Sequence, residues 1–224
     1  MHQHTGSDIK EADAFVRAAD VIFDFAQSFP HLQIIDLGGG FKVAYKKGDH
    51  ITNMPELGAQ LSEAFLNLSK KLGHELQLWF EPGKFLVSEA GFLLVQANVV
   101  KPAPSRTFVG VNSGLNHLIR PMMYDAYHHI VNVSNPETEK TGVYDVVGYI
   151  CETDTFAKDR EINEVREGDV LALLNAGAYG FTMSSHYNSR FRPAEVLIYQ
   201  GKAHLIRQRE TMEDILKNQV LLEL

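Results

Sequence analysis

The sequence predicts an α/β region over residues 1–85, followed by an antiparallel β domain over residues 86–224. In the first region, segments with helical periodicity alternate with short apolar runs, which is typical of βα units. In the second region, apolar runs of strand length follow one another with turns between them and few helices. A chain of 224 residues is long enough for one large domain or for two small ones.

The first region begins with an expected helix over residues 9–29. Asp8 and Glu11 resemble a capping box at its start, and Pro30 ends it. A short buried strand is expected next, at residues 33–36.

The second expected helix is marked by apolar residues on one helical face. Leucine or phenylalanine recurs every three or four residues from Leu57 to Leu72. Gly73 is suited to end this helix in a left-handed conformation. Residues 76–80 form the next expected strand.

Strands dominate the second region. We expect them at residues 85–100, 107–111, 144–151, 170–175, 195–199 and 204–207. Residues 200–202 are typical of a hairpin turn. A short helix is expected within residues 119–130, and a final amphipathic helix begins with Thr211 and Asp214 as capping residues.

Three polar or glycine-rich motifs each follow an expected strand of the first region. They are His4-Thr5-Gly6-Ser7, Gly38-Gly39-Gly40 and Glu81-Pro82-Gly83-Lys84. In parallel βα architectures, ligands bind at the carboxyl ends of the strands. The three motifs therefore predict one binding site.

Each motif offers a group suited to an anionic or aromatic ligand. The backbone N–H groups of residues 38–40 can form an anion-binding nest, and the Ser7 hydroxyl at a helix N-terminus suits a phosphate. Glu81 can hold a positively charged ring nitrogen, and His4 can stack on a flat ring. The alternatives are a plain tight turn for the glycines, an exposed loop carboxylate for Glu81 and a structural histidine for His4.

Residues 177–190 follow neither a helical nor a strand period. Two glycines flank Tyr179, which lets the backbone come close to another group and directs a phenol at it. Asn188, Ser189 and Arg190 offer donors suited to an anionic group. A loop of this kind beside an expected strand is a candidate ligand site.

Two further segments carry candidate substrate-binding residues. Arg120 can bind a carboxylate through two hydrogen bonds, with a surface ion pair as the alternative, and Tyr124 lies in the same segment. Cys151 and Glu152 follow an expected strand and precede an irregular polar sequence. A cysteine in that position can be functional, whereas a lone cysteine is usually buried and structural.

Composition and spacing exclude several function classes. The formal net charge of −7 disfavours a general nucleic-acid binder, which needs a basic face. Cys151 is the only cysteine, so no disulfide forms within the chain and a cytoplasmic protein is expected. No apolar run approaches the ~20 residues of a membrane span. His2 and His4 share a strand face, but no third ligand with suitable spacing is evident, so no metal site is expected.

Taken in order, the motifs resemble the diaminopimelate decarboxylase family of fold-type III pyridoxal-phosphate (PLP) decarboxylases. The resemblance rests on His-x-His-x-Gly-Ser, Asp-Leu-Gly-Gly-Gly, Glu-Pro-Gly, Leu-Ile-Arg-Pro-x-x-Tyr-x-Ala-Tyr-His, Cys-Glu and Gly-Ala-Tyr-Gly-Phe-x-Met-Ser-Ser-x-Tyr-Asn-Ser-Arg. It extends over essentially the whole chain. It implies that residues 1–85 are the last part of an alanine-racemase-like (β/α)8 barrel and that residues 86–224 are an antiparallel β-sandwich or barrel.

The resemblance implies PLP-dependent decarboxylation of meso-2,6-diaminopimelate to L-lysine, a step of lysine biosynthesis. It implies that His4 stacks on the PLP ring and that Glu81 keeps the ring nitrogen protonated. The residues implied to hold the phosphate are Ser7, Gly38, Gly39, Gly40 and Tyr179. Those implied to bind the distal end of the substrate are Lys84, Arg120 and Tyr124, with Glu152 for the distal amino group. Cys151 and His4 are the implied catalytic residues, with Cys151 acting near Cα in reprotonation.

The resemblance also implies a homodimer with shared active sites, because the Cys-Glu pair of the family reaches the partner's site. A related PLP decarboxylase acting on ornithine, arginine or carboxynorspermidine is an alternative, as is a non-catalytic dimerising fragment. Family members commonly have arginine where Lys84 stands, and lysine keeps the charge without the bidentate fork. Their PLP-anchoring lysine lies upstream of the His-x-His motif, which begins here at residue 2. We therefore expect the chain alone to lack turnover.

Overall fold

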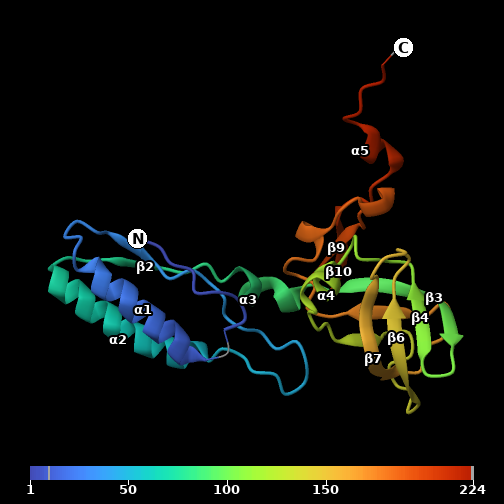
Figure 1. Cartoon of the computed structure of the whole chain (residues 1–224), viewed down its shortest axis with the longest axis horizontal. Coiled ribbons are helices and arrows are strands. Elements are labelled where there is room, and N and C mark those ends of the chain that lie inside the picture. The colour runs from blue at the N-terminus through green and yellow to red at the C-terminus, as the bar shows by residue number, and fades with distance from the viewer. Residues whose placement is uncertain (10, 223–224) are drawn as a thin grey trace. The chain divides into compact units, whose positions relative to one another are not determined.

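The computed structural model describes residues 1–9 and 11–222, and Lys10 of the first expected helix lies outside that part. The chain divides into two compact units, Met1–Ala90 and Gly91–Leu224, which are called here the N-terminal and C-terminal units. Figure 1 labels most of their helices and strands. The expected boundary near residue 86 falls within helix α3 (Gly83–Val87), just before this division.

Parallel strands organise the N-terminal unit. β1 (Ile34–Asp36) pairs in parallel with β2 (Gln77–Trp79), and Ile35 lies opposite Leu78. The first residues of the chain extend this sheet, because Asp36 N–H donates to the Met1 carbonyl at 2.9 Å. Three strand-like segments therefore run side by side and end at the same edge.

Two helices supply most of the core of this unit. α1 (Ala12–Ala26) and α2 (Met54–Leu72) contact each other and bury an apolar cluster that includes Ile35 of β1. Gly73 ends α2 with a φ of 76°, which confirms the expected left-handed cap. The expected capping box of α1 is wrong, because its N-cap Glu11 makes no side-chain hydrogen bond to the helix.

The strand expected over residues 85–100 is only partly correct. Residues 83–87 form α3, and a 3₁₀ helix, η1 (Ser88–Ala90), follows. Leu86 N–H donates to the Pro82 carbonyl at 3.1 Å, and Phe85 packs against the apolar cluster of the N-terminal unit. The strand begins only after this helical segment.

A six-stranded sheet forms most of the C-terminal unit, in the order β5-β8-β3-β4-β6-β7. The strands are β3 (Leu93–Pro102), β4 (Thr107–Val111), β5 (Ile130–Asn132), β6 (Thr141–Val147), β7 (Thr155–Asn163) and β8 (Val170–Leu173). The edge strands β5 and β7 contact each other, so the sheet is a nearly closed barrel around an apolar core.

The expectation of a purely antiparallel domain is wrong at one pair. β4 and β6 run parallel, with Val109 opposite Val146, whereas every other pair in the sheet described is antiparallel. The reason is that the connection between β4 and β6 is long, because it contains α4 (Arg120–Tyr124) and β5. This length lets the chain cross back, so that β6 runs in the same direction as β4.

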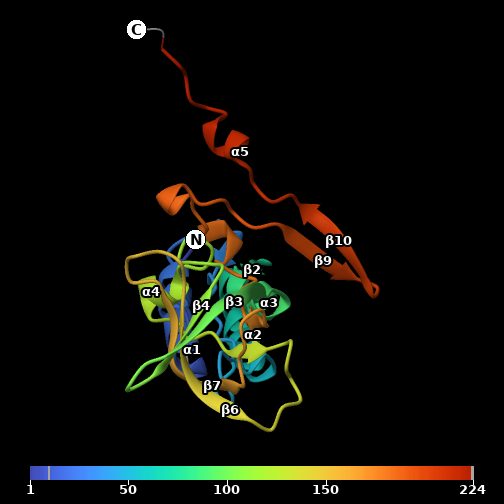
Figure 2. The ribbon, with the colours of Figure 1, turned by 90° about the vertical axis from the view of Figure 1, so that its right-hand side faces the viewer.

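The end of the chain forms a separate hairpin, visible in Figure 2. β9 (Glu195–Tyr199) and β10 (Lys202–Arg207) pair around Gln200 and Gly201, which have φ values of 49° and 74°. Two successive positive φ angles are those of a type I′ turn, which confirms the expected hairpin. α5 (Met212–Leu216) follows with the expected capping box, since Thr211 N–H donates to Asp214 at 2.8 Å. Among the described residues, no helix has the length and apolarity that crossing a membrane requires.

Candidate active site

The three expected ligand-binding motifs meet at the edge where the parallel strands of the N-terminal unit end. Glu81 N–H donates to the Gly38 carbonyl at 2.8 Å. Gly39 N–H donates to the His4 ring at 3.3 Å. The structure therefore brings together the ends of three strands that are distant in the sequence.

Glycine is required at this edge because three backbone segments touch. A Cβ on Gly39 would lie 2.1 Å from the Glu81 carbonyl oxygen. A Cβ on Gly40 would lie 2.1 Å from the Gly6 carbonyl oxygen, and its φ of 97° is also unfavourable for other residues. We call this arrangement of residues 38–40 against the two neighbouring strand ends the glycine cradle.

A cation lies beside the serine of the first motif. The Lys84 ammonium donates to Ser7 Oγ at 2.9 Å and lies 2.6 Å from Asp8 Oδ2, and its side chain is 9% exposed. The structure thus places Lys84 with Ser7. Its implied contact with the distal end of a substrate stays a prediction.

Glu81 has a histidine and an aspartate as neighbours. His2 Nε2 lies 3.2 Å from Glu81 Oε2, and Asp36 Oδ1 accepts from Gly38 N–H at 2.8 Å. One ligand atom from each of His2, Asp36 and Glu81 lies within 4.8 Å of the others. The sequence suggested no third metal ligand beside the histidines, because Asp36 and Glu81 are brought to His2 only by strand pairing.

In the C-terminal unit, Cys151 and Glu152 lie exposed on the turn between β6 and β7. Asp154, a residue that the sequence did not single out, organises this turn. Its buried carboxylate accepts from Ile150 N–H and from Leu115 N–H, both at 2.7 Å. Burial raises the pKa of Asp154, against the two backbone hydrogen bonds that lower it.

The loop over residues 177–190 is shaped by close backbone contacts. A Cβ on Gly180 would lie 2.2 Å from the Ala176 carbonyl oxygen. Tyr179 itself has a φ of 56° and is 53% exposed. Farther along, the Tyr187 hydroxyl donates to Glu152 Oε2 at 2.7 Å, and this hydrogen bond raises the pKa of the Tyr187 phenol.

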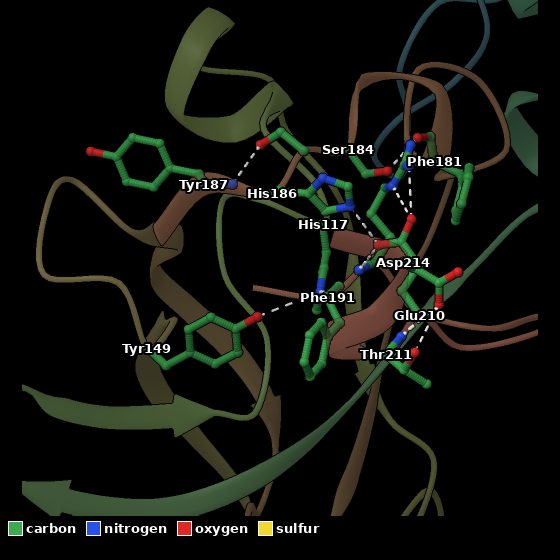
Figure 3. Close-up of polar contacts among 12 residues, drawn as sticks. His117, Tyr149, Phe181, Ser184, His186, Tyr187, Phe191, Glu210, Thr211 and Asp214 are labelled. Carbon is green, nitrogen blue, oxygen red and sulfur yellow. Dashed lines mark hydrogen bonds and ion pairs between the residues drawn. The ribbon is translucent and has the colours of Figure 1, made fainter. Parts of the chain in front are cut away.

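A buried polar network beneath this loop was also not predicted from the sequence. Its His117 ring bonds the Ser113 hydroxyl at 2.9 Å and the Phe191 carbonyl at 2.8 Å. Burial lowers the pKa of His117, which favours the neutral ring. Figure 3 shows His117 between Tyr149 and Phe191. The signal available in the sequence was the cluster of small and polar residues at 112–117.

Arg120 and Tyr124, the two candidates on α4, have opposite environments. Tyr124 is 61% exposed, whereas Arg120 is buried and its Nη1 lies 3.1 Å from His128 Nε2. The Arg120 guanidinium donates, so Nε2 must accept, and Nδ1–H then donates to the Leu174 carbonyl at 2.7 Å. A neutral His128 therefore orients Arg120.

His128 makes the stability of the C-terminal unit depend on pH. Burial lowers the pKa of His128 to about 4, below its ordinary 6.5. The unfolded chain binds the extra proton first, so stability is lost as the pH falls from about 6.5 to 4, by up to about 3 kcal/mol. His128→Gln should lack this component in urea unfolding followed over that range. His204→Gln, an exposed histidine, serves as the control, and an unchanged pH profile in His128→Gln would contradict the assignment.

A family model described as "Pyridoxal-dependent decarboxylase, C-terminal sheet domain" matches residues 20–177. The chain belongs to this family. The curated diaminopimelate decarboxylase of Methanothermobacter thermautotrophicus is 39% identical over 98% of this chain and 53% of its own length. That of Aquifex aeolicus is 40% identical over 97% of this chain and 51% of its own length.

Solved structures of this family agree. The crystal structure of diaminopimelate decarboxylase from M. jannaschii superposes with a TM-score of 0.92 at 33% identity, over 99% of this chain and 51% of the other. A crystal structure of that enzyme in complex with L-lysine gives the same TM-score of 0.92. The chain thus spans about half the length of the relatives it matches.

The N-terminal unit of this family member has side chains that fit PLP. Ser7 offers a hydroxyl for a phosphate, and the Lys84 ammonium lies beside that hydroxyl. Glu81, whose side chain is 55% exposed, offers a carboxylate for a protonated ring nitrogen. These side chains therefore suit the phosphate and the ring nitrogen of the cofactor.

Proposed function

We propose that the protein containing this chain is a PLP-dependent carboxy-lyase that converts meso-2,6-diaminopimelate to L-lysine in lysine biosynthesis. The observation that carries the proposal is the meeting of three strand ends around the glycine cradle, in a chain whose family model is pyridoxal-dependent. The names of the relatives supply the substrate class.

The residues of the N-terminal unit are proposed to hold the cofactor. When bound, PLP supplies an electron sink for the carbanion that remains as CO2 leaves. Glu81 would accept a hydrogen bond from the ring nitrogen and so favour its protonated form. His4 would lie against the ring, and Ser7 with residues 38–40 would hold the phosphate. Tyr179, a residue of the C-terminal unit, is proposed as a further phosphate ligand.

The residues of the C-terminal unit are proposed to recognise the substrate and to return a proton. Arg120, held by His128, binds the distal carboxylate together with Tyr124. Lys84, a residue of the N-terminal unit, is proposed as a further ligand of that carboxylate. Glu152 pairs with the distal amino group. Cys151 donates the proton near Cα after CO2 has left.

The proposed assembly is a homodimer in which Cys151 and Glu152 of one subunit serve the site of the other. A cytoplasmic location is proposed with it. The chain alone is proposed to be inactive, because the lysine that anchors PLP in the family has no counterpart in the motif context found here. The rest of a (β/α)8 barrel is proposed to supply that lysine.

The test measures CO2 release from meso-diaminopimelate, ornithine and carboxynorspermidine. We expect turnover of diaminopimelate by the product of the longest reading frame that contains this sequence, and none by the 224-residue chain. Titration of the chain with PLP should quench Trp79, its only tryptophan and a residue of β2, and Glu81→Gln should weaken that quenching. Turnover by the chain alone, or a preference for ornithine, would contradict the proposal.

A further inference from the structure

Glu152 is exposed, yet its carboxylate has a defined partner. Tyr187 donates its hydroxyl proton to Glu152 Oε2 at 2.7 Å, although the two residues are 35 positions apart. Tyr187 is 40% exposed and lies on the 3₁₀ turn η3 (Tyr187–Ser189). An exposed turn does not hold a side chain in one place unless its ends are fixed.

The ends of this turn are fixed on both sides. On one side, Ser185 N–H donates to the Asn116 carbonyl at 2.8 Å. On the other, the buried His117 ring bonds the Phe191 carbonyl at 2.8 Å. Residues 187–190 between these anchors are exposed, so the anchors decide where Tyr187 can reach.

Glu210 joins the two sides. Its Oε2 lies 2.6 Å from His186 Nε2, and it also accepts from Arg192 N–H at 2.8 Å. Its Oε1 accepts from Arg192 Nε at 2.8 Å and lies 2.7 Å from Nη2. Figure 3 shows His186 and Glu210 facing each other beside Tyr187. One carboxylate thus bridges the residue before Tyr187 and the residue that follows Phe191.

This carboxylate is well suited to act as a fixed bridge. Its side chain is 17% exposed, so water competes little for its hydrogen bonds. Burial alone would raise the pKa of Glu210, but the hydrogen bonds from Arg192 and His186 outweigh it and lower the pKa to about 2. Glu210 is therefore ionised at neutral pH, and its charge-assisted bonds are the stronger kind.

We propose that Glu210 and Tyr187 are positioning residues that hold the Glu152 carboxylate in place to select substrates with a free distal amino group. Glu210 holds the loop ends, the loop presents Tyr187, and Tyr187 orients Glu152. The inference rests on the proposed function for the role of Glu152. Recognition through a single charge pair depends on such preorganisation, because a freely rotating carboxylate binds an ammonium group in many poses.

The first test measures whether Glu210 and Tyr187 position Glu152. It requires no enzyme turnover and uses the 224-residue chain. A water-soluble carbodiimide with an amine labels carboxyl groups, and peptide mass spectrometry reports the rate at Glu152. Losing the Tyr187 hydrogen bond should speed labelling about threefold to tenfold in Tyr187→Phe and in Glu210→Gln. Amide hydrogen exchange over residues 185–192 should rise about tenfold in Glu210→Gln only.

Matched controls are available in the same unit. Glu164→Gln removes a carboxylate that pairs with Lys140 and Arg166, and Tyr199→Phe removes an exposed hydroxyl whose contact is the Gln200 side chain. Both should leave the labelling of Glu152 unchanged. Unchanged labelling in Tyr187→Phe, or unchanged exchange in Glu210→Gln, would overturn the proposal.

The second test uses the longest reading frame and compares diaminopimelate with 2-aminopimelate, which lacks the distal amino group. Tyr187→Phe and Glu210→Gln should each raise KM for diaminopimelate about fivefold to thirtyfold with kcat nearly unchanged. KM for 2-aminopimelate should stay constant, and the double variant should resemble the stronger single one. Independent, multiplying effects would overturn the proposal. If the unsubstituted protein does not act on diaminopimelate, the proposed function is wrong. The labelling test then still shows whether Glu210 and Tyr187 position Glu152.

Discussion

Gly39→Ala is expected to lower the free energy of unfolding of the N-terminal unit by about 2–3 kcal/mol and to weaken PLP binding at least about tenfold. The added Cβ would lie 2.1 Å from the Glu81 carbonyl oxygen and 3.0 Å from its carbonyl carbon. Both are backbone atoms, so no side chain can rotate to make room. The strand end carrying Glu81 must move, which also displaces its carboxylate.

Gly58→Ala provides the matched control for this substitution. Gly58 lies exposed within α2, and nothing would lie within 4 Å of its Cβ. This replacement should stabilise the chain by about 0.5–1 kcal/mol, because alanine favours a helix interior. Urea unfolding and quenching of Trp79 by PLP measure both effects. If Gly39→Ala unfolds in urea and binds PLP like the unsubstituted chain, the glycine cradle is not needed for stability or for PLP binding.

Asp154→Ala is expected to lower the free energy of unfolding of the C-terminal unit by about 2–4 kcal/mol. The substitution leaves the N–H groups of Ile150 and Leu115 without their acceptor in a buried place. The turn that carries Cys151 and Glu152 should lose its conformation. Asp154→Asn should also destabilise, because an amide has one acceptor oxygen and its NH2 would face a donor.

A second variant tests the same contact from the other side. A Cβ on Gly148 would lie 2.1 Å from Asp154 Oδ2, so Gly148→Ala should displace the carboxylate and destabilise similarly. Glu137→Ala, at an exposed residue of the same unit, should have no effect on urea unfolding. The alkylation rate of Cys151, the only cysteine, should change in both Asp154 variants. Stability of Asp154→Ala within about 0.5 kcal/mol of the unsubstituted chain would rule out this role.

The elements that sequence analysis predicted correctly depend on neighbours along the chain. Gly73, the hairpin turn at Gln200 and Gly201, and the Thr211–Asp214 capping box each form within a few residues. Strand β7 was missed because charged residues at positions 158–161 interrupt its apolar alternation. The parallel pairing of β4 with β6 was missed because it depends on a distant return of the chain.

The residues of the candidate site could likewise be predicted only in part. The motifs of the N-terminal unit could be located because each directly follows a strand, and parallel strands end at one edge. The roles of Cys151, Glu152, Arg120 and Tyr179 were inferred from resemblance and stay predictions.

By itself, the sequence determined the local elements, the family motifs and the chemical groups available at each strand end. These depend on backbone preferences and residue types, which act over a few positions. Only the tertiary structure decided that Tyr187 meets Glu152, that Glu210 bridges His186 and Arg192, and that Asp154 holds the turn. Apart from the local bond between Ile150 and Asp154, these pairs join residues 18 to 39 positions apart, so only the folded chain brings them within hydrogen-bond distance.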